Sequence, residues 1–160
     1  MPANTSHQRR ILAVSSGGGH WVELMRTMPA FEGADVAFVT VNRAYRSEVP
    51  GHRFYTVNDA TRWNKIAVAM MALRVLLILM RERPDVVVTT GAAPGYFALR
   101  FGRLFGARTI WLDSIANVDE LSMSGRIVGK YADLWLTQWP HLASGAQPGG
   151  RAPQFAGAVL

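Results

Sequence analysis

Three consecutive glycines followed by a histidine stand near the start of the chain, in the stretch SSGGGH that ends at His20. An apolar run precedes the stretch and a helix-like segment follows it, so Gly17, Gly18 and Gly19 leave uncovered backbone N–H groups at a helix start. Such groups attract an anion or another hydrogen-bond acceptor. The imidazole of His20 can accept a proton near neutral pH. Ser16 and Glu23, which flank the loop, are further candidates for substrate binding, and Glu23 shares a helix face with His20.

Two common phosphate-binding patterns do not fit this loop. A P-loop ends in Gly-Lys-Ser or Gly-Lys-Thr, whereas His20 follows the last glycine. A dinucleotide fingerprint requires glycine or alanine where Val22 stands, and an acid at the end of the second strand, where Asn42 stands. A nucleotide-binding enzyme therefore remains only an alternative.

Further polar groups directly follow apolar runs. Gly91 and Ala92 come after one such run, and Asp113, Ser114 and Asn117 come after another. These residues are candidates for substrate binding, although Asp113 and Asn117 are also typical loop caps.

Strand-like and helix-like segments alternate along the chain, which predicts an α/β fold with a doubly wound, Rossmann-like parallel sheet. We expect one domain over 1–160, with flexible segments at 1–9 and 144–153. Because ligands of such sheets bind beyond the carboxyl ends of the strands, the glycine loop, the Gly91 loop and the Asp113 loop should share one rim. The expected strands are 10–16, 35–41, 52–57, 85–90, 108–113 and 133–137, and the expected helices are 20–28, 61–82, 94–105 and 122–130, with 154–160 as a possible last element.

The composition excludes several classes of protein. The 160 residues are 49% hydrophobic and 18% charged, which is typical of a folded domain. The absence of cysteine excludes disulfides and thiolate metal sites. The net charge of +6 comes from scattered basic residues without an aromatic-interleaved motif, so we expect no nucleic-acid partner. The apolar run near the N-terminus is too short for a signal peptide.

Residues 66–80 form an unusually apolar helical segment, interrupted only by Arg74. A helix of this length spans about 22 Å, less than the roughly 30 Å hydrocarbon core of a bilayer. The segment is thus either a core helix or a helix with one face on a membrane surface. In the second case Arg62, Lys65, Arg81 and Arg83 at its ends would meet lipid headgroups, and Arg74 would also contact the membrane.

Several short motifs resemble one family when they are taken in order. SSGGGH with Glu23 and Leu24 is similar to the first glycine loop of the GT-B glycosyltransferases related to MurG. The later motifs resemble the small PssD-type subunits of oligosaccharide and polysaccharide biosynthesis, a group that includes the membrane-recruiting subunit of the dolichol-linked N-acetylglucosamine transferase. These motifs are Arg83-Pro84-Asp85, the Gly91 loop, Asp113-Ser114, LSMSG at 121–125, Ala132-Asp133-Leu134 and Gln138-Trp139-Pro140.

The resemblance implies one half of an inverting glycosyltransferase, which is active only with a PssE-like subunit that binds the nucleotide-sugar. The chain would bind a polyprenyl-diphosphate-linked acceptor, peripherally on the cytoplasmic face of the inner membrane, in exopolysaccharide or capsule assembly. The donor would be a UDP-sugar. No metal or other cofactor is implied.

Carried over to single residues, the resemblance implies that Gly17 to Gly19 approach the acceptor and that His20 is its base or positions it. Gly91, Ala92, Asp113, Ser114 and Asn117 would line the same rim. The eukaryotic branch tends to have Glu-Ser and a later Arg where this chain has Asp113-Ser114 and Asn117, which points towards the PssD branch. A non-catalytic scaffold that recruits the transferase to a membrane remains the alternative.

Overall fold

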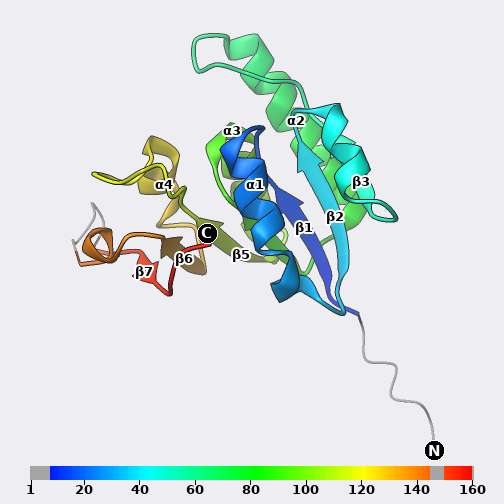
Figure 1. Cartoon of the computed structure of the whole chain (residues 1–160). Helices are drawn as coiled ribbons and strands as arrows, with labels where there is room; N and C mark the ends of the chain where they lie inside the picture. Colours follow the sequence, from blue (N-terminus) through cyan, green and yellow to red (C-terminus); the bar gives the residue numbers. More distant parts are fainter. Residues whose placement is uncertain (1–7, 145–149, 160) are drawn as a thin grey trace, which may run out of the picture.

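A computed structural model describes residues 8–144 and 150–159 of the chain, and a seven-stranded parallel sheet forms its centre (Figure 1). The strand order is β3-β2-β1-β4-β5-β6-β7, and every neighbouring pair is parallel. The predicted Rossmann-like α/β fold is therefore confirmed. The strands are β1 (Arg10–Val14), β2 (Asp35–Thr40), β3 (Arg53–Thr56), β4 (Val86–Thr89), β5 (Arg108–Leu112), β6 (Leu134–Thr137) and β7 (Gln154–Phe155).

Helices cover both faces of the sheet, which explains why its central strands are apolar on both sides. One face packs against α1 and the short helices that follow β1 and β2, and the other face packs against α2 and α3. The core between α3, α4 and the strands β5 and β6 contains Trp111 and Trp135. The helices are α1 (Gly19–Arg26), α2 (Lys65–Glu82), α3 (Ala92–Leu104) and α4 (Met123–Val128), with 3-10 helices η1 (Met28–Phe31), η2 (Arg43–Glu48) and η3 (Pro140–Leu142).

The differences from the expected elements have local causes. The helix expected over 61–82 begins at Lys65, because the side chain of Asn64 accepts the N–H of Ala67 at 3.0 Å and caps the first turn. The helix expected from 94 begins at Ala92, so Pro94 lies in the first turn, which needs no N–H from it. The three 3-10 helices were not expected. Residues 1–7 and 145–149, which make up most of the two segments expected to be flexible, lie outside the described residues.

The strand order reverses between β1 and β4, where neighbouring strands lead into helices on opposite faces. Loops at such a switch point diverge and leave room for a ligand at the carboxyl edge of the sheet. The register aligns Val14 with Thr89, so the glycine loop after β1 and the Gly91 loop after β4 start at the same level. The sheet thus brings these two predicted loops together.

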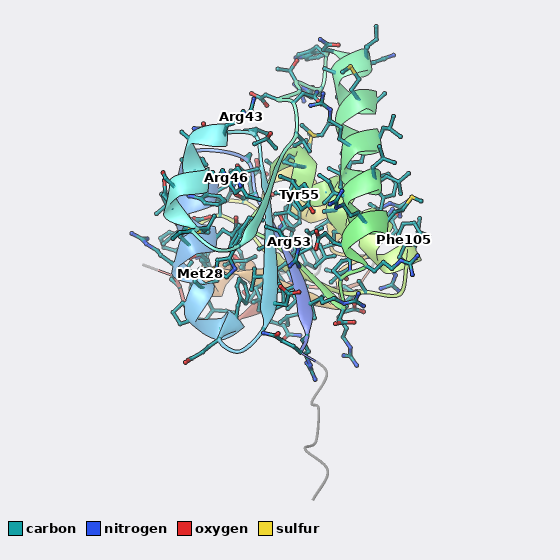
Figure 2. The ribbon with its side chains drawn as sticks, turned by 90° about the vertical axis from the view of Figure 1, so that its right-hand side faces the viewer. Met28, Arg43, Arg46, Arg53, Tyr55 and Phe105 are labelled. Carbon is teal, nitrogen blue, oxygen red and sulfur yellow. The ribbon has the colours of Figure 1, made fainter. Side chains whose placement is uncertain are left out.

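The C-terminal end of α2 is fixed to the edge of the sheet by an ionic cluster. Arg53 on β3 binds Glu82 at 2.9 Å and Asp35 at 3.0 Å, and the hydroxyl of Tyr55 donates to Glu82. Figure 2 shows Arg53 and Tyr55 beside α2. Burial, together with the bond to Glu82, raises the pKa of Tyr55 above its ordinary value. This cluster fixes which side of α2 faces the sheet.

Candidate functional site

His20 joins α1 to the end of β4 through two reciprocal hydrogen bonds. Its Nδ1 lies 2.8 Å from the carbonyl oxygen of Thr90, and the Thr90 hydroxyl donates to the His20 carbonyl at 2.6 Å. Because a carbonyl only accepts, the neutral ring must carry its proton on Nδ1. Within the described part of the chain, no group bonds Nε2, so this nitrogen is left as an acceptor. Such a histidine is suited to take a proton from a hydroxyl group.

The imidazole ring of His20 packs against Gly91. A Cβ atom at Gly91 would lie 2.8 Å from Cε1 of that ring, and the φ of 132° is one that residues with a side chain rarely adopt. Ala92 also has a positive φ, of 64°. The structure therefore brings Gly91, Ala92 and His20 together, as expected.

The glycine loop turns into α1 at Gly18, whose N–H donates to the hydroxyl of Tyr45 at 3.0 Å. Tyr45 lies on η2 and stacks on Trp21, with 4.8 Å between the ring centroids. The N–H groups of Gly19 and His20 have no acceptor among residues 8–144 and 150–159, as is usual in the first turn of a helix. Two backbone donors thus remain available beside the His20 ring.

Sequence reasoning missed Tyr45, because no local pattern shows that the turn after β2 folds back onto the turn after β1. The parallel pairing of β1 and β2 brings their carboxyl ends to the same edge, which is the only signal that could have indicated the contact. Ser16 is half-buried at this edge, and its carbonyl accepts from the hydroxyl of Thr40 at 3.3 Å.

Glu23 lies one turn after His20 and contacts a different loop. The residue is only 3% exposed, and its Oε1 accepts from the Ser114 hydroxyl at 3.0 Å and from the N–H of Ile115 at 2.8 Å. Oε2 is buried and has no partner among the described residues. Glu23 and His20 therefore use one helix face to hold the loops after β5 and β4, which makes Glu23 a positioning residue.

Asp113 is buried and engaged within its own loop. Its carboxylate accepts from the N–H of Ser122 at 2.8 Å and from the Ser122 hydroxyl at 2.6 Å, which fixes the start of α4. Asn117 is half-buried, and its N–H donates to the carbonyl of Ser114 at 3.1 Å. Of this predicted cluster, Ser114 is the member that the structure links to α1.

The residues that weakened the dinucleotide interpretation have other roles. The side chain of Asn42 caps η2 by accepting from the N–H of Ala44 at 3.0 Å, and Val22 lies on the exposed side of α1.

Trp135 is buried in the core, and the indole N–H of Trp139 donates to the Ile115 carbonyl at 2.8 Å. Trp135 therefore serves packing, and Trp139 holds the loop after β5.

Helix α2 has two apolar sides. One side contributes Met71, Val75 and Leu79 to the core. The residues on the other side are 47% to 76% exposed. This exposed set, named the α2 stripe below, recurs every three or four residues and consists of Ile66, Met70, Leu73, Leu77 and Met80.

Basic residues accompany the α2 stripe. Lys65, Arg74 and Arg81 are exposed along the helix, and the guanidinium of Arg62 lies 4.6 Å from the ring centroid of Trp63, which is 80% exposed.

In the described residues, no helix is both long enough and apolar enough to cross a bilayer. No group of three or more His, Cys, Asp or Glu residues suited to a metal ion occurs there either.

The family comparison matches residues 52–149, more than half of the chain, to the family described as "Oligosaccharide biosynthesis protein Alg14 like". The chain is 28% identical to the UDP-N-acetylglucosamine transferase subunit ALG14 of Yarrowia lipolytica, over 86% of this chain and 63% of that protein. It is 25% identical to the subunit of the same name from Eremothecium gossypii, over 84% of this chain and 75% of that protein. The chain thus spans less than two thirds of the Yarrowia relative.

Solved structures with the same fold are about twice as long as this chain. Acinetobacter baumannii MurG superposes with a TM-score of 0.70 at 12% identity, over 87% of this chain and 44% of MurG. UDP-N-acetylglucosamine 2-epimerase from Rickettsia bellii superposes with a TM-score of 0.68 at 14% identity, over 96% of this chain and 46% of the epimerase. These similarities show that the fold corresponds to about half of a GT-B enzyme such as MurG.

The buried bonds of Glu23 lead to a prediction about stability. Replacement of Glu23 by Ala leaves the N–H of Ile115 without its acceptor, so we expect the free energy of unfolding to fall by about 2 kcal/mol. Glu23→Gln keeps an accepting oxygen, and we expect it to lose less than about 1 kcal/mol. Urea unfolding measures both values. Equal losses for the two variants would contradict the positioning role.

Proposed function

We propose that this chain, which belongs to the family of Alg14-like oligosaccharide biosynthesis proteins, is the acceptor-binding, membrane-associated subunit of a two-chain glycosyltransferase. The enzyme would transfer a sugar from a nucleotide-sugar to a polyprenyl-diphosphate-linked acceptor. The relatives are named as subunits of a UDP-N-acetylglucosamine transferase, which favours a UDP-sugar as donor. The departures at Asp113 and Asn117, which resemble PssD-type chains, favour a surface polysaccharide as product.

The main support for this proposal is the environment of His20, at the point between β1 and β4 where the strand order reverses. The bond to Thr90 holds the ring with Nε2 as an acceptor, and the amides of Gly19 and His20 lie beside it without partners in the described residues. A base next to two backbone donors at a helix start suits a ligand with both a hydroxyl and an anionic group. A diphosphate-linked sugar acceptor has both.

The proposed reaction is a direct displacement that needs no metal in this site. The acceptor hydroxyl oxygen forms a bond to the anomeric carbon of the donor while the bond from that carbon to the diphosphate oxygen breaks. The hydroxyl proton passes to Nε2 of His20, and the nucleoside diphosphate leaves with the bonding electron pair. The amides of Gly19 and His20 and the turn at Gly91 and Ala92 would hold the acceptor, while Glu23 and Ser114 keep α1 in place.

The donor would lie on a PssE-like partner subunit. The fold corresponds to 44% of MurG, and the relatives are named as subunits of a transferase, which favours a donor-binding half on a second chain. We expect the chain to have no transferase activity alone and to gain activity with its partner.

The α2 stripe would hold the enzyme against a membrane. Its five exposed side chains form an apolar face along one helix, and Arg62, Lys65, Arg74 and Arg81 can contact anionic headgroups beside it. The exposed Trp63 fits the interface between water and hydrocarbon.

We predict that the double variant Leu73→Gln with Leu77→Gln binds anionic vesicles at least tenfold more weakly than the wild type. The replacements remove apolar area from the α2 stripe while glutamine preserves the helix. Vesicle sedimentation measures the binding.

The matched control is Val22→Gln, which removes an exposed apolar side chain from the opposite face of the sheet. It should leave vesicle binding unchanged. If the control and the double variant weaken binding equally, the α2 stripe is not the membrane contact.

The role of His20 leads to a further prediction. In the two-chain complex, His20→Ala should lower turnover by about 100-fold or more, because the proton acceptor is lost. Assembly with the partner and binding to vesicles should not change. His141→Ala is the control, because His141 is exposed and bonds the Val118 carbonyl after β5. Turnover of His20→Ala within twofold of the wild type would instead support the non-catalytic scaffold.

A further inference from the structure

A cavity lies at the edge of the sheet opposite His20, where β1, β4 and β5 begin. It has a volume of about 520 Å³ and lies between the C-terminal ends of α2 and α3. The proposed sugar transfer does not use this cavity. Its walls combine apolar side chains, among them Leu79, Met80 and Phe105, with the charged side chains of Arg10, Arg83 and Asp85.

The charged side chains that line the cavity carry more positive than negative charge. Asp85 is engaged by Arg10, since its carboxylate accepts the N–H of Arg10 at 2.8 Å and lies 3.6 Å from the guanidinium. The Nε of Arg10 is buried and has no hydrogen-bond partner among the described residues. The exposed Arg83 forms no ion pair with any residue in the described ranges. One carboxylate therefore faces two guanidinium groups.

Arg83 has an unusual backbone conformation. It ends α2 with a φ of 45°, in the left-handed region where glycine is the ordinary residue, and its N–H donates to the Leu79 carbonyl at 2.8 Å. This conformation fixes the start of the Arg83 side chain at the cavity wall. Residues other than glycine that are held in such a rarely populated backbone region cluster at functional sites, where they contact ligands.

The apolar side of the cavity continues onto the exposed surface. Met80 lines the cavity and is also the last residue of the α2 stripe. Phe105 lines it as well, remains 58% exposed, and lies beside the C-terminal end of α2 (Figure 2). A site for a small soluble anion has no need of this apolar surface, whereas an amphiphile would use both kinds of wall.

We propose that this cavity binds a single anionic phospholipid, with the phosphate between Arg10 and Arg83 and the acyl chains over Met80 and Phe105 towards the α2 stripe. The inference rests on the proposed membrane contact, which it deepens by adding a specific lipid site to a general apolar face. The negative charge of the headgroup complements the guanidinium of Arg83, which forms no ion pair with the described residues. The acyl chains cover apolar surface that would otherwise stay in water.

The test uses the whole chain and dihexanoyl phosphatidylglycerol below its micelle concentration, followed by isothermal titration calorimetry. We expect saturable binding of one lipid per chain. Arg83→Gly should weaken this binding at least tenfold, because it removes a guanidinium while glycine suits the positive φ. Arg46→Gln removes one charge from the exposed surface of η2 and should bind like the wild type.

Dihexanoyl phosphatidylcholine and glycerol 3-phosphate distinguish the lipid from other ligands. Each should bind at least tenfold more weakly, because the first lacks net negative charge and the second lacks acyl chains. Equal binding by Arg83→Gly, an equal loss in Arg46→Gln, or tight binding of glycerol 3-phosphate would each overturn the proposal.

The monomeric lipid separates this site from the membrane contact. If vesicle binding depends on Leu73 and Leu77 but the monomeric lipid does not bind, the cavity proposal fails and the membrane contact stands. If the monomeric lipid binds but vesicles do not, the membrane contact fails and the cavity site stands.

Discussion

The two hydrogen bonds between His20 and Thr90 are the contacts on which the arrangement of the rim depends. They join the first turn of α1 to the end of β4 across the point where the strand order reverses. The same bonds fix the imidazole against Gly91 and determine which ring nitrogen carries the proton. Glu23 adds a second link one turn later, to the loop after β5. Helix α1 thus positions two loops and presents an imidazole whose Nε2 has no hydrogen-bond partner among the described residues.

A carboxylate beside a histidine often signals an acid–base pair, but the carboxylates here have other roles. Glu23 and Asp113 are buried, and both accept backbone N–H groups from loops at the rim. A buried N–H without an acceptor destabilises a fold, so these acids hold the loops in place. Among the described residues of the rim, His20 is therefore the candidate base.

Helix α2 has a core side, as one of the two interpretations of its sequence expected, and an exposed apolar side that is free for the proposed membrane contact. Its apolar residues surround the helix because Met71, Val75 and Leu79 face the core while the α2 stripe faces outward. The bonds from Arg53 and Tyr55 to Glu82 select which side is buried.

Strand periodicity and the order of apolar runs predicted the sheet, because a parallel strand covered on both faces leaves a continuous apolar signature. The rim was predicted for the same reason, since the loops at His20, Gly91 and Ser114 each follow a strand. The partners of individual side chains were not predictable. The contact of Tyr45 with Gly18 joins residues 27 positions apart, and the bond from Ser114 to Glu23 joins residues 91 positions apart. Such contacts depend on the register of strands and on loop conformations such as the positive φ of Ala92, which no local pattern encodes.

The proposed function requires that this chain binds the acceptor and leaves the donor to a partner. Nuclear magnetic resonance of the isolated chain tests it directly, through the amide signals of Gly19 and His20 and the imidazole nitrogens of His20. A short-chain isoprenyl diphosphate-linked sugar should shift these signals saturably, while a UDP-sugar should leave them unchanged. Shifts caused by the UDP-sugar, with none from the diphosphate-linked acceptor, would contradict the account.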